Sequence, residues 1–135
     1  MPQVVTVLLI NNEGKILILK RSNKVKTYKG LWGGVAGYIE EYEKPIETAF
    51  KEIKEEVGLE KESVELTKQL EPIVFTDFYE QNKYDWEIFP FLFKLKKNSK
   101  IKIDWEHTEY RWITPSQIKE FETVPHLAQI VLKMF

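Results

Sequence analysis

The start of the chain carries two apolar segments joined by a turn. Residues 4–10 are apolar and largely β-branched, and residues 16–20 form a second segment of the same kind. Between them, residues 11–14 read Asn-Asn-Glu-Gly, a composition typical of a tight turn. This pattern predicts a β-hairpin. Because the first segment does not alternate with polar residues, we expect both of its faces to be buried.

A helical periodicity follows, with apolar residues three and four positions apart between residues 46 and 57. Pro45 suits the first turn of a helix, and Gly58 suits the position just after its last turn. We therefore expect one amphipathic helix from about Lys44 to Val57, with its apolar stripe packed against a sheet. The stripe consists of Ile46, Ala49, Phe50, Ile53 and Val57.

The second half of the chain predicts mainly strands. We expect strands over residues 64–67, 73–75, 77–79, 86–95 and 109–113, a turn at 80–83, and helices over 116–122 and 126–135. Pro90 lies inside the most apolar of these strands. Because proline cannot donate a ladder hydrogen bond, we expect an edge position or a bulge there.

Composition narrows the class of protein. The chain has 135 residues, of which 43% are hydrophobic and 30% charged, as in one soluble globular domain over residues 1–135. The net charge of −1 gives no reason to expect a long nucleic acid as partner. The absence of cysteine excludes disulfides and thiolate metal sites. The early apolar segment is too short to cross a bilayer, so we expect no membrane partner and a cytoplasmic location. We expect either a monomer or a homodimer.

Three glutamates of the predicted helix share one face. Glu52, Glu55 and Glu56 are three and four positions apart, which brings their carboxylates to the same side. Like charges so placed repel one another. A bound Mg²⁺ or Mn²⁺ would remove that repulsion, because these ions favour carboxylate oxygens and substrate phosphates. The alternative is an ordinary solvated helix face in a chain rich in Glu and Lys.

The wider spacing around these glutamates resembles the Nudix box, G-x5-E-x7-R-E-U-x-E-E-x-G-U, where U is aliphatic. The matching positions are Gly37, Glu43, Glu52, Ile53, Glu55, Glu56, Gly58 and Leu59. The chain is therefore similar to the Nudix hydrolases. Three positions depart from the pattern: Lys51 replaces the box arginine, Val35-Ala36-Gly37 replaces Pro-Gly-Gly, and Tyr42 replaces a glycine.

The resemblance implies an α/β fold, namely a Nudix-like α/β/α sandwich with a mixed β-sheet flanked by helices. It also implies metal-dependent hydrolysis of a nucleoside diphosphate linked to another moiety, with Mg²⁺ (or Mn²⁺) as cofactor. The substrate we expect first is a nucleoside triphosphate or an oxidised nucleotide. Two alternatives stay open: an ADP-ribose or dinucleotide pyrophosphatase, and a nucleotide-binding regulatory module with little turnover.

The resemblance also assigns roles to individual residues. The metal ligands that it implies are the carbonyl of Gly37 and the carboxylates of Glu52, Glu55 and Glu56, with Glu52 and Glu55 also candidates for catalysis. Lys51 would orient a box glutamate, although an ammonium braces a carboxylate less rigidly than a guanidinium does. Glu43 would stabilise the loop before the helix. Glu106 is the first choice for the general base or a further ligand, and Glu109 is the second.

Three residues are candidates for substrate binding: Arg21, Trp86 and Glu109. Arg21 opens a basic segment, residues 21–30, whose charges could meet phosphates. Trp86 lies in the aromatic-rich segment 75–89 and could stack on a base. The alternatives are a solvated basic loop, an aromatic side chain in the core, and, for Glu109, an exposed polar position.

Overall fold

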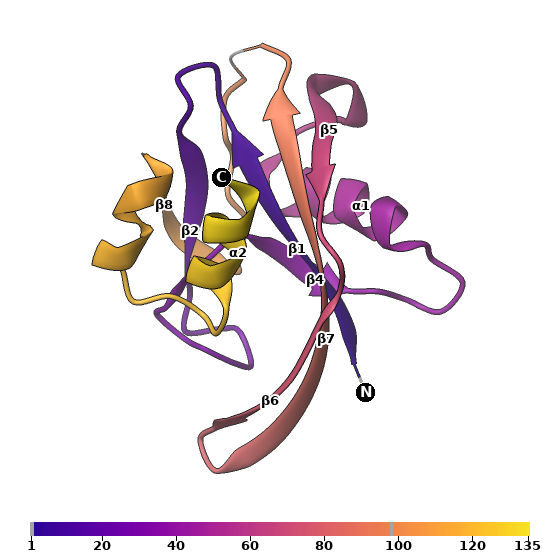
Figure 1. The fold of residues 1–135 in the computed structure, drawn as a ribbon, viewed down its shortest axis with the longest axis vertical. Helices are drawn as coiled ribbons and strands as arrows, with labels where there is room; N and C mark the ends of the chain where they lie inside the picture. Colours follow the sequence, from indigo (N-terminus) through magenta and orange to yellow (C-terminus); the bar gives the residue numbers. More distant parts are fainter. Residues whose placement is uncertain (1, 98) are drawn as a thin grey trace.

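A computed structural model describes residues 2–97 and 99–135 (Figure 1). The strands are β1 (Gln3–Ile10), β2 (Ile16–Arg21), β3 (Trp32–Gly33), β4 (Val35–Tyr38), β5 (Val64–Gln69), β6 (Ile73–Tyr79), β7 (Asn82–Leu95) and β8 (His107–Ile113). The α-helices are α1 (Pro45–Val57) and α2 (Leu127–Met134), and the 3₁₀ helices are η1 (Lys61–Ser63) and η2 (Pro115–Glu120). None of the helices in this described part is long and apolar enough to cross a membrane.

The strands form one mixed sheet. β1 runs parallel to β7 over its whole length, and the other pairs are antiparallel. The predicted hairpin is confirmed, because β1 and β2 pair next to their turn at Ile10 and Ile16. Further along, β1 pairs with β4 while β2 pairs with β3 and β8. The two strands therefore separate beyond the turn. β4 pairs with β1 and so places Gly37 next to β1.

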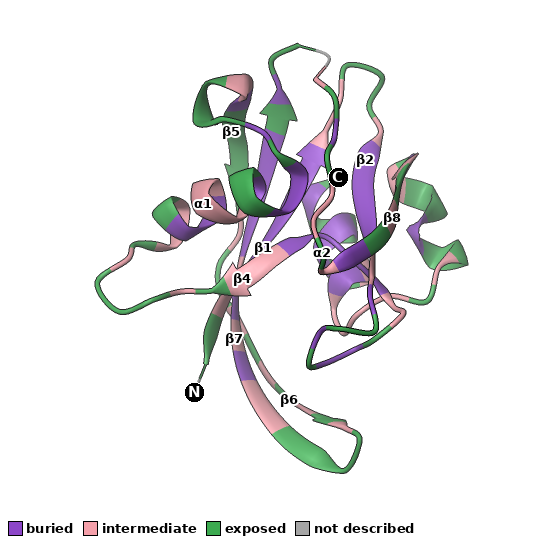
Figure 2. Cartoon of the chain, turned by 180° about the vertical axis from the view of Figure 1, so that it is seen from behind, coloured by how far each residue is buried: buried purple, intermediate pink, exposed green. Residues whose placement is uncertain are grey.

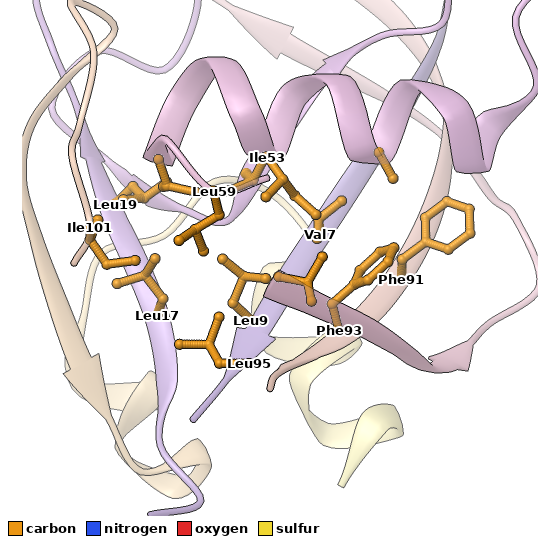
Figure 3. Close-up of a cluster of buried hydrophobic side chains, with 14 of the residues drawn as sticks. Val7, Leu9, Leu17, Leu19, Ile53, Leu59, Phe91, Phe93, Leu95 and Ile101 are labelled. Carbon is orange, nitrogen blue, oxygen red and sulfur yellow. The ribbon is translucent and has the colours of Figure 1, made fainter. Parts of the chain in front are cut away.

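Helices cover both faces of this sheet, which confirms the expected α/β/α sandwich (Figures 1 and 2). Alternate residues of β1 contribute to opposite cores: Val7 points to the α1 side and Leu8 to the α2 side. Both are almost fully buried, as predicted for this strand. Figure 3 shows the core on the α1 side, where Ile53 packs among side chains of β1, β2 and β7.

The sequence of helix α1 explains its bounds. Pro45 occupies the first turn, and the Glu47 carboxylate accepts a hydrogen bond from the Lys44 backbone N–H at 2.7 Å. Gly58 ends the helix with a φ of 74°, a conformation that glycine adopts without strain. The predicted helix is confirmed. Ala49, Ile53 and Val57 are fully buried. The glutamates lie along one side of this buried stripe, with Glu56 buried, Glu52 half-buried and Glu55 exposed.

The β6–β7 hairpin decides between the two positions expected for Pro90, an edge strand or a bulge. Pro90 is not on an edge strand, because β7 pairs with β1 on one side and with β5 and then β6 on the other. The Pro90 carbonyl accepts a hydrogen bond from Leu70 at 3.1 Å. Since the N–H and C=O groups of one strand residue point to the same side, the proline nitrogen faces the short break between β5 and β6. The missing donor therefore costs no ladder bond.

The last third of the chain follows the prediction with one change of helix type. Segment 115–120 is a 3₁₀ helix, shorter than the helix expected over 116–122. Thr114 precedes it, and its backbone N–H donates to the Gln117 side chain at 2.8 Å. α2 is confirmed, and its Leu127 and Ile130 side chains are buried against the sheet. These two residues also form one wall of the cavity described below.

Candidate functional site

The loop before α1 is held by Glu43. One carboxylate oxygen of Glu43 accepts hydrogen bonds from the Glu40 backbone N–H and the Thr48 hydroxyl, both at 2.9 Å. The other accepts from Lys51 Nζ at 2.8 Å. These donors, Lys51 first, lower the pKa of Glu43 to about 2. Lys51 therefore orients a box glutamate, as expected, but it acts on the loop and does not line the cavity.

Gly37 and Glu52 lie in close contact. β4 brings the Gly37 backbone against the side chain of Glu52, and a methyl group built on Gly37 would overlap the Glu52 carboxyl group. The glycine is needed here for close approach rather than for an unusual φ. The structure thus brings together two of the predicted metal ligands, which come from different elements.

Glu56 is the most unusual residue of the site. It is only 1% exposed, and one carboxylate oxygen accepts a hydrogen bond from the Ala36 backbone N–H at 3.3 Å. Among the described residues, its other oxygen has no hydrogen-bond partner. Burial, and then the charges of Glu106 and Glu52, raise the pKa of Glu56 well above its ordinary value. A buried carboxylate with a free oxygen fits a cation ligand, because a buried charge needs a partner.

His107 lies beside Glu56 but does not neutralise it. The distance from His107 Nε2 to Glu56 Oε1 is 3.7 Å, which is too long for a hydrogen bond. His107 Nδ1 lies 3.1 Å from Asp104, which fixes the orientation of the ring. Burial lowers the pKa of His107, while the neighbouring Asp104 opposes the shift. This lowered pKa disfavours the charged imidazolium, and in residues 2–97 and 99–135 no Lys or Arg forms an ion pair with Glu56.

Glu52 and Glu55 complete the acidic face of α1. Burial and the charge of Glu55 raise the pKa of Glu52 to about 7. Glu55 is exposed, next to Glu52 but outside the cavity wall. Across residues 2–97 and 99–135, no three acidic or histidine side chains are gathered tightly enough to hold a metal ion alone. An ion here would also need the Gly37 carbonyl, water or substrate oxygens, which is the usual coordination of Mg²⁺.

Glu106 and Arg21 face the same cavity from the other side. Glu106 precedes β8, and burial together with the charge of Asp104 raises its pKa, while Arg21 opposes the shift. The Arg21 guanidinium donates to the Thr27 carbonyl at 2.9 Å through Nε. Burial lowers the pKa of Arg21 from its ordinary value of 12.5, and the charges of Glu106 and Glu56 oppose this. The predicted base, Glu106, and the predicted phosphate ligand, Arg21, therefore lie in the wall of the same cavity.

These residues line one end of a cavity of about 470 Å³. Its polar end contains Gly37, Glu52, Glu106 and Arg21. Its other end is apolar, with walls from β1, β6, β7, α2 and the segment before α2. The apolar lining consists of Val4, Phe75, Trp86, Ile88, Val124, Pro125, Leu127 and Ile130.

A hydrogen-bonded chain closes the cavity where loop 22–30 meets the β6–β7 hairpin. Trp86 Nε1 donates to the Tyr28 hydroxyl at 3.3 Å, and that hydroxyl donates to Asp77 at 2.8 Å. The Lys29 backbone N–H donates to the Tyr79 hydroxyl at 3.1 Å. Trp86 is thus placed in the cavity wall, as its predicted substrate role requires, but its indole N–H is already used.

In the structure, Glu109 lies away from the other predicted site residues. It lines a separate hollow together with Lys20 and Arg111, and its carboxylate lies 3.4 Å from Arg111 Nε. Alternation alone would send His107 and Glu109 to the same face of β8, because they are two residues apart. The pairing of β8 with β2 shifts its register between these two residues, so His107 turns toward Glu56 while Glu109 stays with Arg111. The structure therefore does not place Glu109 in the cavity wall with Glu106.

Several residues of the site escaped the sequence analysis. The Ala36 N–H, the Tyr28–Asp77 bond and the α2 wall are all contacts between segments distant in sequence. Tyr28 and Asp77, for example, are 49 residues apart. Nothing in the local pattern of polar and apolar positions indicates such pairs. The aromatic content of segment 75–89 was the one available signal for this wall.

Comparison with known proteins agrees with this geometry. The family pattern described as NUDIX domain matches residues 1–134. The chain belongs to the Nudix family. Its curated relatives include nucleoside triphosphatase NudI from Escherichia coli, 26% identical in an alignment of 121 residues that covers 84% of this chain and 83% of the relative.

Solved structures of this family share the fold. An Ap4A hydrolase of C. elegans in a binary complex superposes with a TM-score of 0.81 at 16% identity, covering 99% of this chain and 95% of that one. The dihydroneopterin triphosphate pyrophosphohydrolase of E. coli also gives a TM-score of 0.81, at 20% identity, covering 97% and 92%. At these identities the likeness supports the Nudix fold and not a particular substrate.

Proposed function

We propose that this Nudix hydrolase cleaves a phosphoric anhydride bond of a nucleoside triphosphate, releasing a nucleoside monophosphate and pyrophosphate, with Mg²⁺ (or Mn²⁺) as cofactor. The observation that carries the proposal is the single cavity with carboxylates and Arg21 at one end and apolar walls at the other. Such a cavity matches a molecule with a charged phosphate chain and a flat, weakly polar base. The naming of the relative NudI as a nucleoside triphosphatase supports the same substrate class.

The residues that would hold the cation are Glu52, Glu55, Glu56 and the carbonyl of Gly37. The partnerless oxygen of Glu56 is the feature that fits an ion best, because it is buried and free. A divalent cation held by these residues would neutralise phosphate oxygens and lower the pKa of bound water. Glu56 contributes a fixed carboxylate, and Gly37 leaves Glu52 room to approach.

Glu106 is the residue that we assign as general base. It lines the cavity opposite α1, and burial raises its pKa toward the range in which a carboxylate accepts a proton effectively. The proton leaves the attacking water as the new P–O bond forms, and the anhydride P–O bond breaks, so that the products are the nucleoside monophosphate and pyrophosphate. Arg21, oriented by the Thr27 carbonyl, balances phosphate charge. Lys51 has an indirect role, because its bond to Glu43 keeps the loop before α1 in place.

The alternative of a regulatory module with little turnover rested on Lys51 in place of arginine. In the structure Lys51 still reaches Glu43, so this replacement gives little reason to expect lost activity. An ADP-ribose or dinucleotide substrate would present two adjacent phosphates as well. Product analysis separates these substrates from nucleoside triphosphates.

The test is release of pyrophosphate from nucleoside triphosphates by the purified protein, with and without Mg²⁺ or Mn²⁺. We expect release only with a divalent cation, and a loss of about 100-fold or more in Glu52→Gln. Mg²⁺ should also raise the melting temperature of the wild type, through linkage, and raise that of Glu52→Gln less. The exposed Glu65→Gln on β5 is the matched control. Full activity of Glu52→Gln would contradict the metal assignment.

A further inference from the structure

The apolar end of the cavity offers a bound group unusually few directed hydrogen bonds. On its helical side, the backbone N–H groups are already used. Val124 donates to the Trp32 carbonyl at 2.9 Å, and Leu127 donates to the Val124 carbonyl at 3.3 Å. Ile130 donates at 3.0 Å to the carbonyl that precedes α2, and Pro125 has no N–H. This wall therefore has no backbone donor among these residues to present to a base.

The hydrogen-bond donors of Trp86 and Tyr28 are also used within the protein. Trp86 gives its indole N–H to Tyr28, and Tyr28 gives its hydroxyl hydrogen to Asp77. Burial and the bond to Asp77 raise the pKa of Tyr28 to about 12, so the phenol stays protonated and bonded. Thr6, Thr27 and Tyr38 are the hydroxyl side chains that remain in the lining, and Thr27 accepts from Arg21. A hydroxyl rotates and can donate or accept, so it distinguishes bases weakly.

Selectivity between similar substrates depends on fixed donors and acceptors. A site built to hydrogen-bond a substrate group rejects an analogue without that group by about 10⁴–10⁵-fold, whereas an apolar pocket discriminates by only about 10–200-fold. Stacking on an aromatic ring tolerates any base, because every base has a π-face. The apolar end has aromatic walls, Phe75 and Trp86, and no fixed donor of the kind described above.

We infer that the wall formed by Trp86 and α2 receives the nucleobase by shape and by contact with Trp86, and that the enzyme accepts purine and pyrimidine triphosphates with kcat/KM values within about tenfold of one another. This inference rests on the proposed function and makes it narrower. It favours a base-tolerant triphosphatase over one that singles out an oxidised base. Recognition is then concentrated at the phosphate end.

The experiment measures kcat/KM for ATP, GTP, CTP and UTP, and dissociation constants for their non-hydrolysable α,β-methylene analogues. We expect both sets of values to lie within about tenfold. A larger preference for one base overturns the inference and leaves the proposed function intact. If no triphosphate is hydrolysed, the proposed function fails, and the dissociation constants still test base tolerance. Absence of binding by all four analogues overturns the inference as well.

Two variants test whether the base contacts Trp86. Trp86→Leu should raise KM for all four bases by a similar factor, about tenfold, while Trp86→Phe, which keeps a ring, should raise it less. Phe78→Leu is the matched control, because Phe78 is exposed on the hairpin outside the cavity. A Trp86→Leu protein that folds and loses only one base overturns the inference. So does turnover of geranyl diphosphate above that of every nucleotide, which would assign the apolar end to a hydrocarbon chain.

Discussion

The two ends of the cavity differ in whether their buried polar groups have hydrogen-bond partners within the protein. At the glutamate end, Glu56 keeps a buried oxygen without a partner in the described chain, and neighbouring carboxylates raise one another's pKa. At the apolar end, the Trp86 and Tyr28 donors are already bonded within the protein. The first end costs stability until a ligand arrives, whereas the second is complete without one. Unsatisfied groups therefore indicate where this protein needs a ligand, and satisfied groups indicate where it only accommodates one.

Glu56→Gln should have the largest effect on this contrast. Removing the buried charge should lower kcat/KM by about 100-fold or more, because a cation loses its most enclosed ligand. The same change should raise the free energy of unfolding of the metal-free protein by about 1 kcal/mol, because the desolvated charge is gone. Turnover assays and urea denaturation with a chelator measure the two effects. Glu65→Gln, exposed on β5, should change neither. A Glu56→Gln protein that is inactive and also less stable would mean that Glu56 is structural.

Gly37→Ala tests the contact between β4 and α1. The added methyl group would overlap the Glu52 carboxyl group and displace it, so we expect kcat/KM to fall between about tenfold and a hundredfold. Gly33→Ala is the matched control, because its methyl group would meet the Val124 side chain at an ordinary 3.6 Å. Equal effects of the two alanines on activity would remove Gly37 from the site.

The pH dependence of stability tests the glutamate end without any substrate. In the metal-free protein Glu52 has a pKa of about 7, above its ordinary value of 4.5. Between these values the folded state binds more protons than the unfolded state, so the free energy of unfolding falls as pH rises from about 4.5 to about 7. Urea denaturation with a chelator across this range measures the slope. Glu52→Gln should flatten it, and an unchanged slope would place the titration elsewhere.

Lys51→Arg should have the smallest effect. A guanidinium can still donate to the Glu43 carboxylate, which Lys51 now contacts at 2.8 Å, so we expect kcat/KM within about threefold of the wild type. Lys51→Met removes the bond and should lower activity further. A large loss in Lys51→Arg, with Lys51→Met unaffected, would mean that the brace on Glu43 does not support the site.

The fold was predictable where periodicity is strong. Helix α1 and the β1–β2 hairpin were predicted nearly to the residue, because their apolar spacing, turn residues and Gly58 all agree. For Pro90 the sequence left an edge position or a bulge open, and the edge is wrong. The local rule about a missing N–H is correct, but the break between β5 and β6 that satisfies it arises from pairing between distant segments.

The candidate site was predictable at its glutamate end and much less at its apolar end. The box residues lie on one helix and one adjoining strand, so their spacing in sequence carries over into space. The pairing of Tyr28 with Asp77, and the use of Leu127 and Ile130 as a wall, depend on how the sheet closes. The structure does not place Glu109 in the cavity for the same reason. A shift of one residue in the pairing of β8 with β2 decides which side of the sheet its side chains face.

The change of partner at Pro90 gives the β6–β7 hairpin a degree of independence. Beyond that point, β7 leaves β5 and extends with β6 as a projecting ribbon (Figures 1 and 2). The ribbon carries Phe75 and Trp86, whereas α1 carries the carboxylates. A bend of the ribbon would thus widen or narrow the space between Trp86 and α2, while α1 kept its position on the sheet. The residues proposed to contact a base and those proposed to hold a cation therefore lie on different elements of this small protein.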